Sequence, residues 1–121
     1  MDGEGENEVN ETDTSCEFSE REGGFLIRYS EGEGDARCAV RILYSHGMLT
    51  VKREGAVRSE LKFAEGERLV GSYFVGAYGF DAEVHTKRLT VLKGDGLEVK
   101  LSYDMSLGGV ERSCEMQISL N

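Results

Sequence analysis

The chain has 121 residues, of which 39% are hydrophobic and 31% are charged, a balance typical of one globular domain. Its formal net charge of −9 arises mostly in the first 22 residues, which hold nine acids and one base, whereas the remaining 99 residues carry 14 acids and 13 bases. A nearly neutral body gives no attraction to a phosphate backbone, and no apolar run approaches the roughly 18–20 residues that a bilayer span needs. We therefore expect neither nucleic-acid binding nor membrane binding.

The N-terminus and the cysteines point to a reducing compartment. The chain is acidic from Asp2 onward and lacks the basic start and apolar centre of a secretory signal. Cys16, Cys38 and Cys114 are odd in number and widely spaced, and no C-x-x-C pair suggests zinc or redox chemistry. We expect a cytoplasmic protein with reduced, mostly buried thiols and with no metal or cofactor.

The first 14 residues differ from the rest in composition. They are polar and acidic, with Val9 as the only branched aliphatic residue after Met1. We expect residues 1–14 to form a flexible lead or a weak edge strand, followed by one β-domain over residues 15–121.

From Ser15 onward, short runs of alternating apolar and polar residues are separated by glycine-containing turns. This period of two predicts half-buried β-strands. The clearest run is 97–107, which follows the hairpin signal Asp95-Gly96. The predicted strands begin near Cys16 and continue at 25–30, 38–44, 48–53, 57–63, 69–75, 80–87, 97–107 and 114–120.

This series of strands indicates an all-β fold. Strands spaced 8–12 residues apart are typical of barrels and sandwiches, and tight turns between successive strands favour an antiparallel up-and-down meander. One apolar face per strand requires a shared interior, which a sheet gains by closing on itself. We expect a single antiparallel β-barrel of about eight strands, closed or partly open, with a β-sandwich as the alternative.

The order of several short motifs resembles a known family. The motifs are Arg53-Glu54-Gly55 with Val57, then Leu61, Phe63 and Gly66, then Tyr73, Tyr78-Gly79, Val84 with Thr86, Gly96-Leu97, Leu101 with Tyr103, and Met116 with Ile118, while the flank from Phe25 to Tyr44 fits in order. In these features the chain resembles the YwiB-like family of small uncharacterised bacterial proteins. The resemblance implies a lipocalin-like (calycin-type) β-barrel, and it implies no activity because none is established for the family.

One departure from the family bears on oligomeric state. Members usually begin with an additional strand, and here the acidic segment from Met1 to Asp13 takes its place. A barrel left open at that point has an edge that must be covered or paired with another chain. The sequence therefore motivates the hypothesis of a homodimer.

Arginine and tyrosine side chains supply the candidate ligand contacts. Three arginines share the parity of apolar neighbours near strand ends, which predicts guanidinium groups that point inward at the barrel mouths. Intracellular lipid-binding barrels resemble this arrangement, in which interior Arg and Tyr hold a carboxylate. The alternative is that the arginine side chains extend to solvent, and that a β-bulge near Arg88 turns its side chain outward. The candidates are Arg53, Arg88 and Arg112, the hydroxyl groups of Tyr73 and Tyr103, and Tyr78 in a loop that rims a mouth.

No catalytic or metal-binding constellation is present in the sequence. His46 lies in a turn, His85 lies on the polar parity of its strand, and neither has a partner at metal-ligand spacing. We expect a non-enzymatic barrel that binds a small amphipathic or anionic molecule in its lumen. The alternatives are a structural or interaction module, a homodimer with a packed core and no ligand, and, least supported, an enzyme of unknown activity.

Overall fold

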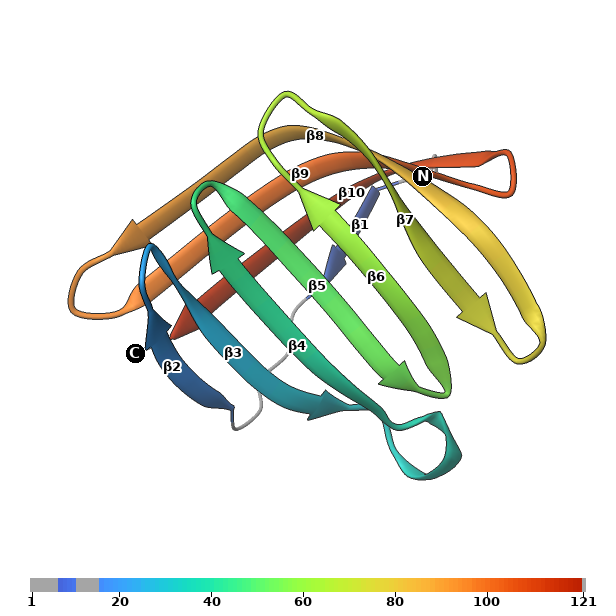
Figure 1. Cartoon of the computed structure of the whole chain (residues 1–121), viewed down its shortest axis with the longest axis horizontal. Coiled ribbons are helices and arrows are strands. Elements are labelled where there is room, and N and C mark those ends of the chain that lie inside the picture. The colour runs from blue at the N-terminus through green and yellow to red at the C-terminus, as the bar shows by residue number, and fades with distance from the viewer. Residues whose placement is uncertain (1–6, 11–15, 121) are drawn as a thin grey trace.

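The computed structural model describes residues 7–10 and 16–120, and its strands form one ten-stranded sheet (Figure 1). Strands β2 to β10 follow one another as an antiparallel meander, and β1 is added parallel to β10. The strands are β1 (Asn7–Asn10), β2 (Glu17–Arg21), β3 (Gly24–Glu31), β4 (Cys38–Ser45), β5 (Met48–Gly55), β6 (Val57–Phe63), β7 (Arg68–Val75), β8 (Tyr78–Lys93), β9 (Leu97–Leu107) and β10 (Val110–Leu120), with a short 3-10 helix, η1 (Gly34–Ala36), between β3 and β4.

The sheet curls into an open barrel. Strands β2 to β6 lie over β8, β9 and β10, and β7 connects the two layers (Figure 1). The sheet begins at β1 and ends at β2, and these strands do not pair with each other in the described ranges. The prediction of an antiparallel up-and-down barrel, partly open, is confirmed, and the alternative of a sandwich of two separate sheets is wrong. No helix of the described part of the chain is long and apolar enough to span a bilayer.

The N-terminal segment contributes one short strand to the sheet. Asn7 lies opposite Ser113, and Asn10 lies opposite Met116. The prediction of a flexible lead over residues 1–14 otherwise falls on residues 1–6 and 11–14, which lie outside the described residues. The acidic N-terminal segment therefore includes one strand of the sheet, β1.

Alternation of side chains along the strands builds the core. The completely buried side chains on the inner face include Phe25, Leu49, Phe63 and Val99. Burying such a side chain stabilises the fold by roughly 1.5–3 kcal/mol. These residues lie toward the turns near residues 23, 47, 66 and 95, which we call the core end. The opposite end, with the turns near residues 33, 56, 76 and 108, we call the mouth.

Strand β8 contains a β-bulge that changes which residues face inward. Its register against β9 shifts between Thr86 and Arg88, so Lys87 is the extra residue. Thr86 is buried before the bulge, whereas Leu89 packs against the core after it. Arg88 is therefore exposed on the outer side. The prediction that Arg88 points inward is wrong, and the alternative of a bulge that turns it outward is confirmed.

Candidate functional site

An ion pair on the inner face at the mouth is the centre of the candidate site. Arg53 of β5 donates from Nε to Oε2 of Glu31 on β3 at 2.9 Å, and the two side chains are 22% and 31% exposed. Burial opposes the charge on Arg53, but the hydrogen bond and charge of Glu31, together with the phenol groups of Tyr29 and Tyr103, raise the pKa of Arg53 above its ordinary value. The guanidinium is thus a fixed positive charge in a half-buried place.

Two hydroxyl-bearing side chains continue from Arg53 across the sheet. Arg53 lies opposite Ser59 of β6, and Ser59 lies opposite Tyr73 of β7. Directly opposite residues of antiparallel strands share a face, with Cβ atoms about 4.5–5.5 Å apart. Ser59 is only 5% exposed, and its Oγ has no hydrogen-bond partner in the described ranges. The row therefore offers an unused hydroxyl directly beside a cation.

Tyr103 closes the inner side of the site. It is 5% exposed on β9, and its ring packs against Phe63, with the two ring centroids 4.7 Å apart. Because its phenol also contributes to the raised pKa of Arg53, Tyr103 bridges the apolar core and the polar row. The interior thus changes from apolar at the core end to polar at the mouth.

Exposed apolar side chains form a rim around the polar row. Val75 and Tyr78 lie opposite each other, and Phe80 lies opposite Tyr73, so all of them share its face. Val110 begins β10 at the same end. These four rim residues are between 41% and 74% exposed. A cation with apolar surface beside it matches an amphipathic anion.

The six candidates from the sequence differ in their places. Arg53, Tyr73, Tyr78 and Tyr103 come together on the inner face toward the mouth. Arg112 shares the inner parity of Cys114 near the mouth end of β10, and it is exposed. Arg88 lies outside this group.

Sequence reasoning missed two residues of the site, Glu31 and Ser59. The predicted strand 25–30 ends one residue before Glu31, yet Glu31 continues the inner-facing alternation of Phe25, Ile27 and Tyr29, which is the signal that could have found it. Ser59 stood among the apolar residues of its predicted strand, but only the structure shows that its hydroxyl lacks a partner.

A pair of side chains links the edge strand β2 to the end of β8. Glu20 of β2 accepts a hydrogen bond from Lys93 of β8 at 2.7 Å, and this hydrogen bond with the charge of Lys93 lowers the pKa of Glu20. A cleft of about 360 Å³ beside the pair includes Phe18 and Leu120 among its lining residues. The edge strand β2 is therefore joined to β8, which is not its neighbour in the sheet, by an ion pair between side chains.

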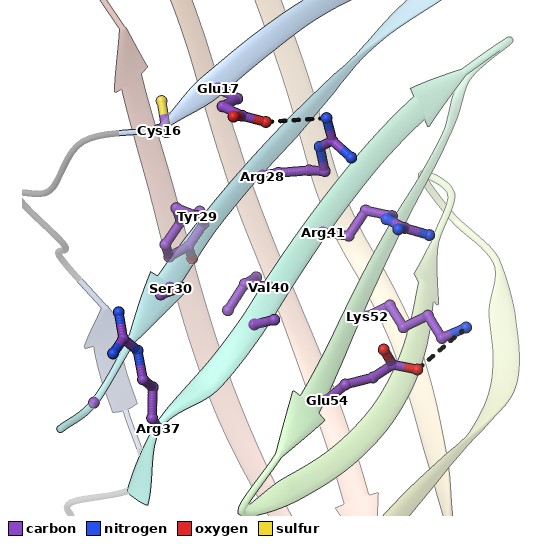
Figure 2. Close-up of a pocket in the computed structure, with 12 residues that line it drawn as sticks. Cys16, Glu17, Arg28, Tyr29, Ser30, Arg37, Val40, Arg41, Lys52 and Glu54 are labelled. Atoms are coloured by element: carbon purple, nitrogen blue, oxygen red, sulfur yellow. Dashed lines mark ion pairs between the residues drawn. The ribbon is translucent and has the colours of Figure 1, made fainter. Parts of the chain in front are cut away.

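A larger cleft lies over β3, β4 and β5, with a volume of about 910 Å³ (Figure 2). Arg28, Arg41 and Lys52 come from these three neighbouring strands and extend the same way (Figure 2). They lie on the outer face, because they alternate with inward residues such as Arg53. In residues 7–10 and 16–120, no three His, Cys, Asp or Glu side chains are grouped so that they could hold a metal ion.

Comparisons with known proteins agree with the fold. Residues 1–118 match the family described as Domain of unknown function (DUF1934). The structure is similar to the crystal structure of the ywiB protein from Bacillus subtilis, with 20% sequence identity and a TM-score of 0.76, over 88% of this chain and 73% of that chain. A search of curated proteins finds no match. At this sequence identity the likeness to the solved structure shows the fold alone.

Proposed function

The chain belongs to the DUF1934 family, a domain of unknown function, and from the geometry of its site we propose that the protein binds a small amphipathic anion at the mouth of the barrel. The observation that carries this proposal is the inward Arg53 beside the buried, unpartnered hydroxyl of Ser59. We also propose a cytoplasmic location, because the three cysteines are odd in number and form no disulfide bond in the described residues.

Arg53 has donors to spare for a ligand. A guanidinium carries five N–H donors, and Glu31 accepts only from Nε. The Nη groups suit a carboxylate or phosphate, which binds such a fork through two hydrogen bonds. Ser59 Oγ and the Tyr73 hydroxyl lie in the same row and add neutral hydrogen bonds.

The nonpolar part of the ligand stays near the rim. Phe25, Leu49, Phe63 and Val99 fill the core end and are fully buried there. A ligand tail therefore packs against Val75, Tyr78 and Phe80 rather than reaching through the barrel. This geometry favours short amphipathic anions over long-chain ones, and binding rather than catalysis.

Titration with a fluorescent analogue of a short-chain fatty acid tests the proposal. Arg53→Gln removes the cation, so we expect affinity to fall at least about tenfold, equivalent to about 1.4 kcal/mol. Arg88→Gln is the matched control, because this arginine is exposed on the outer side, and it retains wild-type affinity. Circular dichroism checks that both variants are folded. If the wild-type protein binds no such probe, or if both variants lose binding equally, the proposal is wrong.

A second candidate function is self-association through the open end of the sheet. Strand β2 is the last strand of the sheet, and in the described ranges no strand pairs with its free edge. Unpaired edges are templates for strand pairing with another chain. Light scattering at high protein concentration that shows only monomer would remove this candidate.

A further inference from the structure

We propose that the cleft on the outer face of β3, β4 and β5 is a separate anion site that takes a diphosphate or triphosphate group. Arg28 lies opposite Arg41, and Arg41 lies opposite Lys52, so three cations are direct neighbours across three strands. Like charges directly opposite each other destabilise a sheet. A protein with a formal net charge of −9 nevertheless gathers three positive charges at this point.

Acidic side chains neutralise the positive charges of Arg28 and Lys52 at the two ends of the row, but not the charge of Arg41 in its middle. Glu17 pairs with Arg28 at 3.0 Å, and Glu54 lies 3.9 Å from Lys52. Arg41 is exposed between them and has no acidic partner within 4.0 Å in the part of the chain that the structure describes. A bound anion at Arg41 would relieve the repulsion from both neighbours.

The spacing of the row favours phosphate chains over acidic peptides. Neighbouring strands lie about 4.8 Å apart, whereas side chains on one face of an extended peptide repeat about every 6.5–7 Å. Arginine forks bind phosphate oxygens through paired hydrogen bonds, and Lys52 adds a point charge. The cleft volume of about 910 Å³ lies within the range of about 300–1,000 Å³ that is typical of small-molecule sites.

Calorimetric titration with inorganic tripolyphosphate at low salt tests this site. Arg41→Gln should weaken binding at least about tenfold, because it removes the uncompensated cation. Lys62→Gln is the matched control: Lys62 is an exposed cation on the outer face of β6, outside the row, and its loss leaves affinity within about twofold of wild type. A parallel titration with ATP separates the two sources of the group, since tighter binding of ATP assigns the site to a nucleotide and equal binding assigns it to a free phosphate chain.

The same variants distinguish this site from the mouth. Lys52 and Arg53 are consecutive residues on opposite faces of β5, so Arg41→Gln leaves binding of the fatty-acid probe unchanged. Absence of any binding of tripolyphosphate to the wild type at millimolar concentration would overturn the inference. Equal losses in Arg41→Gln and Lys62→Gln would also overturn it, because they would indicate only the general charge of the protein.

Discussion

Replacing Ser59 by alanine should change stability and ligand affinity in opposite directions. Ser59 is 5% exposed, and its Oγ has no hydrogen-bond partner in the described part of the chain. Burying an unpaired hydroxyl costs about 1–3 kcal/mol in protein mutational data, so Ser59→Ala should stabilise the free protein by about 1 kcal/mol. A hydrogen bond to a charged ligand contributes about 1.5–3 kcal/mol, so the same change should weaken binding of an anionic probe about tenfold or more.

Urea unfolding and probe titration on the same samples measure the two effects. The urea midpoint should rise while the slope of the transition stays constant. Thr86→Val is the matched control, because Thr86 is 0% exposed with an unpartnered Oγ1 and does not neighbour Arg53 in the sheet. It should gain similar stability and keep wild-type affinity. If Ser59→Ala destabilises the protein by more than about 1 kcal/mol, or if both variants lose affinity equally, the hydroxyl does not have the proposed role.

Three further predictions concern the ion pair and the sheet. A double-mutant cycle of Arg53→Gln and Glu31→Gln, measured by urea unfolding, should give a coupling free energy of about 1–2 kcal/mol. This value lies above the coupling energies of solvent-exposed ion pairs. A coupling free energy near zero would contradict the contact between the two side chains. Burial and the charge of Glu31 raise the pKa of Tyr29 above 10.0. The stability that this shift contributes is complete below the pKa of Tyr29 in the unfolded chain and is lost as pH rises through its pKa in the folded protein. Ultraviolet titration of tyrosinate should show this late ionisation, and Glu31→Gln should lower the pKa of Tyr29. Gly71→Ala places a Cβ against the backbone carbonyl of Glu60 and should lower the unfolding free energy by more than about 2 kcal/mol, whereas a wild-type urea midpoint would show that the two strands separate easily.

Most of the fold was predictable because the strands are long and alternate strictly. The run Leu97–Leu107 keeps one apolar parity over its whole length, and its pairing with β8 and β10 follows from short turns. The bulge at Lys87 was only an alternative, because the alternation of residues 80–87 contains no sign of it. It depends on contacts with the turn before β7, where Gly66 N–H donates to the carbonyl of Thr86 at 2.8 Å and Leu89 N–H donates to the carboxylate of Glu65 at 2.9 Å.

The site was predictable in residue type more than in its connections. Arg53 shares a parity with Val51, and this pattern placed it correctly on the inner face. Its partner Glu31 lies 22 residues away, and no local pattern joins the two. Likewise, a hydroxyl without a partner, such as that of Ser59, is a property of the assembled sheet and not of any sequence window.

Binding of an amphipathic anion at the mouth through Arg53 can be tested by nuclear magnetic resonance of isotopically labelled protein titrated with a short-chain fatty acid, hexanoate. We expect saturable chemical-shift changes centred on Arg53, Ser59 and Tyr73, which are absent in Arg53→Gln. Changes centred on Leu97 and Leu120 at the core end, or no changes at all, would contradict it.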